Sequence, residues 1–389
     1  MTLWKVVFRH PPGQAILWSS TLPAGPMFPL LSTEVLAVQP LSKAVALPAP
    51  FYCDPLLRAL DDRAVFACSW QLVCHQSRLA GVGDHVVAEI AGVPIVVVRS
   101  DEDSIRAFHN VCRHRAGPLA RCDGRGARAL RCKYHGWTYG LDGVLRSAPE
   151  MSGAEDFEPG DIRLPEVRVH VWRGLVFLAI GEAPRFEEFI DGIDARLGVD
   201  NAMADYRLHH RSSYDLACNW KVYVDNYLEG YHVPHVHPGL NELLDYRSYV
   251  TQTDEWYSFQ CSPLESAPDL YGSGEALYYF LYPNAMLNIL PGRLQTNRVV
   301  PIGVERCRVE FDFYYAVDER SDAADRRARD LEFSDEVQLE DVAICEDVQR
   351  GLSSGSYHAG RLNPLRENAV HHFHELLRRA YRAVAPTRE

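Results

Sequence analysis

The stretch "CRHRAGPLARCDGRGARALRCKYHGW", residues 112–137, contains two short motifs in which a cysteine and a histidine stand close together. Cys112 is followed by His114, and after seventeen intervening residues Cys132 is followed by His135. Thiolate sulfur and imidazole nitrogen are ligands of zinc and of iron–sulfur clusters. Because glycines lie in and between the two motifs, the stretch predicts two loops that converge on a metal or cluster.

The distribution of the ligands favours a cluster over zinc. A zinc finger pairs Cys with Cys and His with His at short spacing. Here each loop supplies one Cys and one His, which suits two irons that each take both ligands of one kind. A structural zinc site remains the alternative, and Cys122, inside the same stretch, is expected to be a loop thiol.

A second motif lies in "NWKVYVDNYLEGYHVPHVHPGL", residues 219–240. Glu229 and His232 are three residues apart, so they are predicted to share a helix face. Pro234 is predicted to break that helix and to let His237 fold back toward His232. Two histidines with one carboxylate form the facial triad of non-haem Fe(II) oxygenases. His235 is a competing ligand.

Together the two motifs resemble those of the Rieske non-haem iron oxygenase α subunit, over about residues 47–380. The stretches "DNYLEGYHVPHVHPGL" and "FLYPNAMLNILPGRLQTNRVVP" are most similar to the choline, glycine betaine and carnitine monooxygenase group. The resemblance implies an α+β fold. It consists of an N-terminal all-β Rieske [2Fe-2S] domain and a C-terminal helix-grip (START-like) catalytic domain, in which helices cover an antiparallel sheet.

The resemblance also implies roles for individual residues. The cluster is expected on Cys112, His114, Cys132 and His135, and the mononuclear iron on His232, His237 and Asp341. Asp341 belongs to the acidic stretch "QLEDVAICEDVQRGLSSG", residues 338–355, within a helix predicted over about 334–352, where Glu346 and Asp347 are the alternatives. Glu229 stands where most of the family has Asp, as a bridge to a Rieske histidine of the neighbouring subunit. Asn226 and Asp225 are expected to orient the ligands.

The implied activity is that of a terminal oxygenase that uses O2 and electrons from NAD(P)H. No G-x-G-x-x-G pattern follows a strand, so the electrons are expected from a separate reductase of the flavin or ferredoxin type. The expected substrate is a small quaternary amine such as choline, glycine betaine or carnitine, which is hydroxylated, N-demethylated or cleaved at C–N. The alternatives are ring hydroxylation of an aromatic acid, and an electron-carrier Rieske protein without a second iron. The expected assembly is a homotrimer that closes head to tail.

Aromatic residues are frequent between the predicted helices, and their role stays open between a cation–π cage and ordinary core packing. They are Trp256, Tyr257, Tyr271, Tyr278, Tyr279, Phe280, Tyr282, Tyr314 and Tyr315. Arg293 and Arg298 are candidates for binding a substrate carboxylate.

Composition sets the remaining limits. The chain has 389 residues, 47% of them apolar and 24% charged, which suits two globular domains. A net charge of −12 disfavours nucleic acid and anionic membranes as partners. Ten cysteines are too sparse for a disulfide scaffold, and the sequence contains neither an apolar span nor a signal-peptide pattern, so a cytoplasmic protein is expected.

Three segments are predicted along the chain. Residues 1–46 are rich in proline and are expected to be a poorly ordered tail. Residues 47–181 are expected to form the Rieske domain with a leading helix, and residues 182–389 the catalytic domain. Residues 83–100 are predicted to form two strands around a glycine turn, and residues 170–181 are predicted to form a strand-like run.

Overall fold

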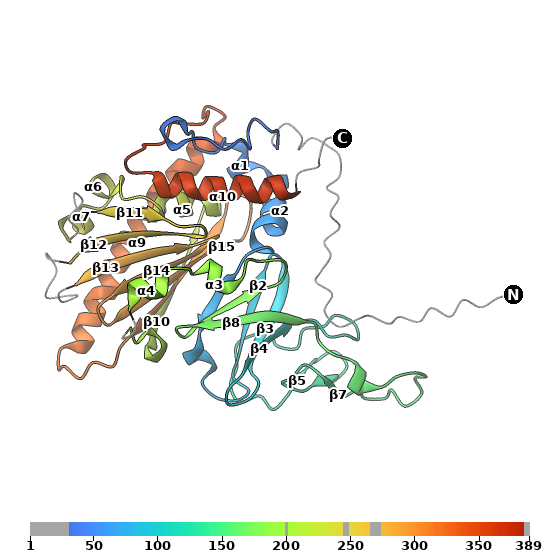
Figure 1. The fold of residues 1–389 in the computed structure, drawn as a ribbon. Helices are drawn as coiled ribbons and strands as arrows, with labels where there is room; N and C mark the ends of the chain where they lie inside the picture. The colour runs from blue at the N-terminus through green and yellow to red at the C-terminus, as the bar shows by residue number, and fades with distance from the viewer. Residues whose placement is uncertain (1–30, 199–200, 244–248, 265–273, 385–389) are drawn as a thin grey trace.

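The N-terminal half is built from short antiparallel strands. The computed structural model describes residues 31–198, 201–243, 249–264 and 274–384 (Figure 1). A six-stranded sheet has the order β1-β9-β8-β4-β3-β2, and a three-stranded sheet has the order β5-β6-β7. Their strands are β1 (Gln71–His75), β2 (His85–Ile90), β3 (Val93–Arg99), β4 (Ile105–His109), β5 (Leu130–Arg131), β6 (Thr138–Tyr139), β7 (Leu145–Ser147), β8 (Glu166–Trp172) and β9 (Leu175–Ala179). The short helices η3 (Gln76–Leu79) and η4 (Pro159–Asp161) connect them.

The two strands predicted over residues 83–100 are confirmed as β2 and β3. Their turn uses Ala91 and Gly92, both with positive φ, as a tight hairpin of twisted strands requires. The strand-like run of residues 170–181 is in fact the end of β8, a turn and β9. Arg173 and Gly174 have φ of 47° and 82°, which reverses the chain between the two strands.

The C-terminal half is a seven-stranded antiparallel sheet of order β10-β16-β15-β14-β13-β12-β11. Its strands are β10 (Arg207–Leu216), β11 (Val250–Thr253), β12 (Tyr257–Pro263), β13 (Glu275–Leu281), β14 (Ala285–Leu290), β15 (Arg293–Pro301) and β16 (Cys307–Tyr315). Its helices are α3 (Phe186–Phe189), α4 (Ile193–Leu197), η5 (Met203–Asp205), α5 (Trp220–Tyr227), α6 (Val233–Val236), α7 (Pro238–Leu243), α9 (Ala323–Ser353) and α10 (Asn368–Val384). The predicted combination of an all-β unit with a helix-covered antiparallel sheet is confirmed.

The N-terminal segment packs differently from the prediction. Residues 1–30 of the expected tail lie outside the described residues, but residues 31–46 are placed, with Leu36 and Ala44 buried. The leading helical segment is η1 (Leu41–Lys43), α1 (Pro50–Cys53), α2 (Pro55–Leu60) and η2 (Asp61–Phe66). Its apolar side chains, Leu57 among them, share a core with Trp220 and Phe373 of the C-terminal half. The segment therefore covers the catalytic sheet and not the small β sheets.

Two helix boundaries also differ from the prediction. The helix expected to carry both Glu229 and His232 is α5, which ends at Tyr227 with Leu228 as its C-cap. Pro234 does not end a longer helix, as predicted, but lies in the first turn of the separate helix α6. No helical hydrogen bond is lost there, because the first N–H groups of a helix have no partner within it. The late helix α9 begins at Ala323, eleven residues before the predicted start.

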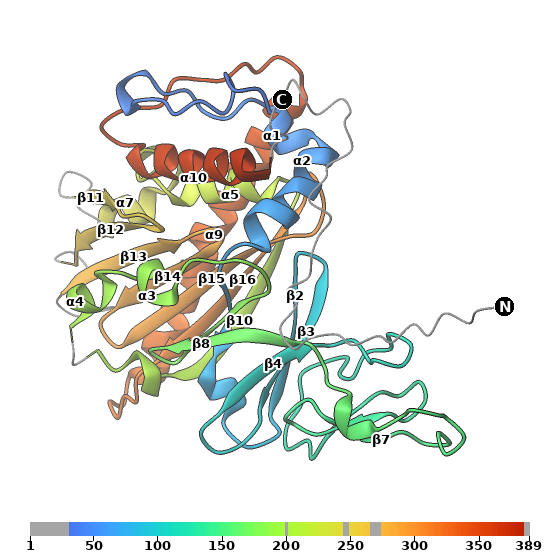
Figure 2. The ribbon, with the colours of Figure 1, turned by 45° about the vertical axis from the view of Figure 1, so that its right-hand side comes forward.

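The two halves share a core. Leu72 and Phe177 of the six-stranded sheet pack with Tyr279, Leu287 and other side chains of the seven-stranded sheet. In both ribbon views the loops around β5 and β7 lie at the opposite end of the molecule from α6 and α7 (Figures 1 and 2). Among the helices of the described ranges, none has the length and apolar composition needed to cross a membrane.

Candidate functional site

The two cysteine–histidine loops have the same backbone design. In each, the Cys carbonyl accepts a hydrogen bond from the amide four residues on, Ala116 or Gly136, at 3.0 Å. The amides of Cys112 and Cys132 in turn donate to carbonyls five residues on, at 2.9 Å. Ala116 and Gly136 both have positive φ, 56° and 75°, which closes each loop tightly. The loops thus present their ligands in matched positions.

The four predicted cluster residues are brought together. Cys112 and Cys132 are buried, whereas His114 and His135 are exposed with ring centroids 4.6 Å apart. A Cβ on Gly117 would lie 2.9 Å from the Cys132 sulfur, so this glycine leaves the sulfur side open. Two buried thiols behind two exposed imidazoles fit a [2Fe-2S] cluster with its histidine-bound iron toward the surface.

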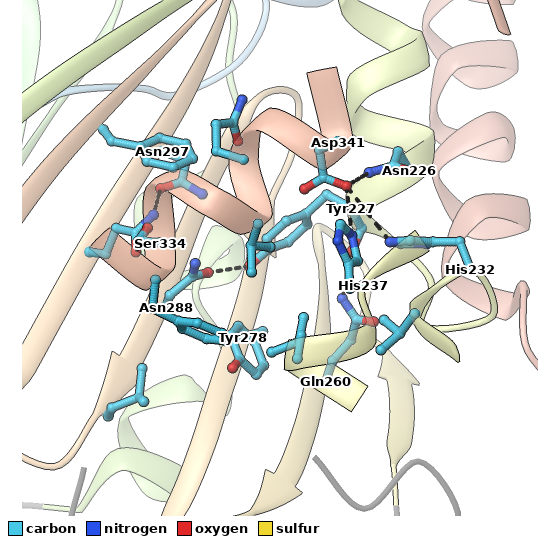
Figure 3. A pocket seen from close by; sticks show the side chains of 18 of the residues that line it. Asn226, Tyr227, His232, His237, Gln260, Tyr278, Asn288, Asn297, Ser334 and Asp341 are labelled. Carbon is cyan, nitrogen blue, oxygen red and sulfur yellow. Dashed lines mark hydrogen bonds and ion pairs between the residues drawn. The ribbon is translucent and has the colours of Figure 1, made fainter. Parts of the chain in front are cut away.

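The second constellation joins α6 to α9. His232, His237 and Asp341 each offer one ligand atom, and these atoms lie within 4.8 Å of one another. The Nε2 atoms of His237 and His232 are 3.0 Å and 3.8 Å from Asp341 Oδ1 (Figure 3). The short helix α6 separates the two histidines, which turns both rings toward the long helix. The set matches the two-histidine, one-carboxylate arrangement of non-haem iron sites.

A second carboxylate orients each histidine. The Nδ1–H of His232 donates to Glu229 Oε1 at 2.7 Å, and that of His237 donates to Glu340 Oε2 at 2.7 Å. A carboxylate only accepts, so Nδ1 of each ring carries the proton of this hydrogen bond, and Nε2 is the atom turned toward the site. Burial opposes the charged ring of His237, yet the hydrogen bonds to Asp341 and Glu340 raise its pKa above the ordinary value.

A cavity of about 150 Å³ opens beside the three residues, between α9, α5 and the sheet (Figure 3). Four tyrosines line it: Tyr223, Tyr227, Tyr249 and Tyr278. Burial raises the pKa of each, so all four rings carry neutral hydroxyls near neutral pH.

Amide side chains form the sheet-side wall of the cavity. Asn288 accepts from the Tyr227 hydroxyl at 2.7 Å, and Gln295 donates to Asn297 at 2.8 Å. Arg293 is the one Lys or Arg among the described residues that line the cavity. Its guanidinium donates to Asp330 at 2.6 Å, which balances its charge.

Several predicted residues lie outside this site. Asp225 faces away from the cavity, where it accepts from Tyr52 at 2.7 Å and from His374 at 2.9 Å. Its neighbour Asn226 donates to Asp341 at 2.6 Å, as expected of a residue that orients a ligand. Successive helix residues point about 100° apart, so Asp225 and Asn226 face different neighbours.

The alternative ligands are also placed elsewhere. Glu346 accepts from the Ala217 amide at 2.9 Å, Asp347 pairs with Arg350, and His235 is exposed. These positions leave Asp341 as the carboxylate at the site.

Most of the aromatic residues whose role was left open between a cage and core packing belong to the core. Tyr278 lines the cavity, whereas Tyr257, Tyr279, Phe280, Tyr282 and Tyr314 are buried in the hydrophobic clusters, and Trp256 and Tyr315 pack against them. Tyr271 lies outside the described residues. Arg298 pairs with Glu310 and does not line the cavity.

Glu340 and three of the four cavity tyrosines were not predicted from the sequence. Glu340 directly precedes Asp341, and an adjacent pair of acids on a helix could have suggested a ligand with a supporting carboxylate. Tyr223 and Tyr227 lie four residues apart on α5, a spacing that places both on one face. Tyr249 carries no such signal, because its place depends on the fold of the segment after α7.

Family comparisons agree with this geometry. Residues 69–165 match the family model described as Rieske [2Fe-2S] domain, and residues 203–383 match that described as ring hydroxylating alpha subunit (catalytic domain). The chain is 39% identical over 364 residues to choline monooxygenase, chloroplastic, of Arabidopsis thaliana, covering 89% of this chain and 85% of that protein. It is 32% identical over 356 residues to the carnitine monooxygenase oxygenase subunit of Escherichia coli K12, covering 87% of this chain and 95% of that protein.

Solved structures show the same fold. The quaternary ammonium Rieske monooxygenase CntA in complex with an inhibitor superposes with a TM-score of 0.81 at 27% identity, covering 90% of this chain and 98% of that chain. CntA in complex with L-carnitine superposes with a TM-score of 0.77 at 28% identity, covering 87% and 96% of the two chains.

Proposed function

The chain belongs to the Rieske non-haem iron oxygenase α subunits, enzymes with a [2Fe-2S] cluster and a mononuclear iron, and we propose that it hydroxylates a small quaternary amine. The family inferred from the two sequence motifs is thereby confirmed. The iron, when bound, supplies the activation of O2 for insertion into a C–H bond. The electron-carrier alternative, without a second iron, is disfavoured because the histidine–carboxylate site is intact.

We assign the ligands from the two constellations. Cys112, Cys132, His114 and His135 would hold the cluster, and the Nε2 atoms of His232 and His237 with Asp341 would hold the iron. Glu229 and Glu340 would orient both imidazoles so that their Nε2 atoms face the iron. Asn226 would fix the Asp341 carboxylate through its 2.6 Å hydrogen bond.

The observation that carries the substrate proposal is the charge of the cavity. Its four tyrosines are neutral, its arginine is balanced by Asp330, and the Glu229 carboxylate, which binds His232, also lines it. Such a cavity attracts a cation, and tyrosine faces stabilise a trimethylammonium group through cation–π interactions. An aromatic acid would find no uncompensated cation among the described lining residues, which disfavours that alternative.

The proposed reaction consumes O2, one C–H bond, two electrons and two protons, and yields one hydroxyl group and one water. If the hydroxylated carbon is bonded to nitrogen, the product can release the amine by C–N cleavage. The chain's own part is to bind the cation and to exclude water with its aromatic lining. It would also hold the iron through the Nε2 atoms of the two histidines and the Oδ1 atom of Asp341.

The electrons are proposed to arrive from a separate reductase and to cross a subunit boundary. Within one chain the loops around β5, which carry the cluster residues, and α6 lie at opposite ends of the molecule, which favours transfer to a neighbouring subunit (Figure 1). A homotrimer closed head to tail would bring each cluster against the next subunit's catalytic half. Glu229 is proposed as the bridge there, because its carboxylate already binds His232 and can accept a further hydrogen bond.

The test combines metal analysis with turnover. Anaerobically purified protein is expected to contain about three irons and two sulfides per chain, with a Rieske-type paramagnetic resonance signal after reduction. With NADH and a reductase, choline, glycine betaine or carnitine should then be hydroxylated, and benzoate should not. Hydroxylation of benzoate alone, or zinc without sulfide, would contradict the proposal.

The cytoplasmic location expected from the sequence stays a prediction, since the Arabidopsis relative is named chloroplastic.

A further inference from the structure

The stretch that carries the cluster ligands is strongly basic within an acidic chain. Residues 112–137 contain seven arginines and lysines and one acidic residue, a formal charge of +6. The whole chain carries −12, so the remaining residues carry −18. The seven basic residues are all exposed: Arg113, Arg115, Arg121, Arg125, Arg128, Arg131 and Lys133. A positive surface of this kind attracts negatively charged partners over a Debye length.

Part of this surface is a fixed loop, residues 121–128, which we name the basic loop. Gly124 exchanges two backbone hydrogen bonds with His85 of β2, at 2.8 Å and 3.0 Å. The amide of Gly126 donates to Asp84 at 3.0 Å. The loop's one acidic side chain, Asp123, is paired with Arg78 and accepts from the Val87 amide at 3.0 Å. The loop therefore has a defined shape, and its acid does not cancel its own arginines.

The three arginines of the basic loop have no such partner. Among the described residues, no carboxylate forms an ion pair with Arg121, Arg125 or Arg128. The loop also joins the two ligand loops directly, since Arg121 follows Cys112 by nine residues and Arg128 precedes Cys132 by four. A protein bound there would lie beside the cluster.

We infer that the basic loop is the docking surface for an acidic one-electron carrier that reduces the cluster. The inference rests on the proposed function, which requires an external electron donor. In each transfer one electron leaves the reduced carrier and enters the oxidised cluster, with no bond made or broken, and two transfers supply one hydroxylation. The basic loop is anchored to β2 through the backbone of Gly124, and the two exposed histidines, His114 and His135, belong to the flanking loops and are not part of it.

The test measures cluster reduction, not product. A plant-type [2Fe-2S] ferredoxin, an acidic protein of lower potential than Rieske clusters, serves as the donor. Its rate of reduction of the cluster is followed by stopped-flow absorbance at 20 mM and 300 mM salt. The wild-type rate constant is expected to fall about tenfold with salt. R121E/R125E/R128E should be about tenfold slower at low salt and almost insensitive to salt. The neutral variant R121Q/R125Q/R128Q should lie between.

The matched control is R185E/R320E/R350E, which changes the net charge equally at three arginines whose side chains are 75%, 59% and 70% exposed. It should retain the wild-type rate within about threefold, the range left to the change in net charge alone. Reduction by dithionite should be unchanged in all variants, which establishes that the cluster is intact.

Three outcomes would overturn the inference. The control could slow reduction as much as the loop variant, or the loop variant could leave reduction unchanged. The loop variant could instead slow transfer from a pre-reduced cluster to the iron, which would make the loop part of the subunit contact. The donor rates could also be as expected while the pre-reduced protein oxidises no quaternary amine. That result would count against the proposed function and not against the docking surface.

Discussion

His232 and His237 show how single carboxylates decide the chemistry of the site. Each ring has one nitrogen bound to a glutamate and the other directed at Asp341. Because the glutamates accept a hydrogen bond from Nδ1, the Nε2 atoms are the ones turned toward a metal. Asp341 Oδ1 lies 3.0 Å from the Nε2 atom of His237, so the atoms proposed as ligands face one another.

The two metal centres should be separable by single substitutions. Cys112→Ala removes a cluster ligand, so the brown colour and the sulfide should be lost while mononuclear iron is retained. Asp341→Ala removes an iron ligand, so the cluster should remain and about one iron per chain should be lost. Iron, sulfide and visible absorbance check both, and equal loss of both centres in either variant would break the assignment.

Glu340 should act on the iron through His237. Glu340→Gln removes the charge that makes this imidazole a stronger ligand, so Fe(II) affinity should fall about 10- to 100-fold. Titration of the apo protein with Fe(II) measures this directly, and the cluster absorbance should not change. Glu336→Gln, one turn earlier on the exposed face of α9, is the control. An unchanged affinity in Glu340→Gln would show that His237 needs no such support.

At the scale of elements, α5 is held in place by a buried ionic network. Lys221 and Asp61 form a fully buried ion pair that joins α5 to η2. Asp61 also accepts from Trp220 at 2.8 Å and from Tyr381 of α10 at 2.5 Å. These contacts fix the helix that carries Tyr223, Asn226 and Tyr227 into the cavity.

Breaking this pair should be costly. Asp61→Asn leaves the Lys221 ammonium buried without a counter-charge, so the protein should lose about 3–5 kcal/mol of stability. Asp215→Asn breaks the half-exposed pair with Arg308 and should cost no more than about 1 kcal/mol. Denaturation monitored by circular dichroism, at equal metal content, compares the two. Equal losses would mean that the buried network does not hold α5.

At the scale of the whole molecule, activity should depend on neighbours. If each cluster serves the next subunit of a trimer, Cys112→Ala and Asp341→Ala subunits are each inactive alone but complement each other when mixed. Random equal mixing pairs a working cluster with a working iron at about one interface in four, so about a quarter of the wild-type activity should return. Activity after co-refolding or co-expression, with mass by light scattering, checks this. No recovery in mixed trimers would place the electron path inside one chain.

The sequence by itself determined the ligand types and their local grouping. The Cys–His loops and the Glu229–His232–His237 motif are contained in short segments, where backbone geometry alone brings side chains together. Individual strands and the C-terminal part of the acidic helix were also predictable, because residue patterning is a local property, whereas the antiparallel sheet was implied by the resemblance. The resemblance then supplied Asp341, which is more than a hundred residues from the histidines.

Only the tertiary structure decided what meets across the chain. Which neighbour faces the cavity, Asp225 or Asn226, depended on where α5 packs, and the pairing of Glu340 with His237 depended on the contact of α9 with α6. The same holds for Arg293. Only its tertiary contact with Asp330 shows that its positive charge is balanced. Residues 31–66 were predicted to be part of a tail and a helix of the Rieske domain, but their apolar side chains are buried against the catalytic half. Burial and pairing are long-range, and they follow from packing that no short segment encodes.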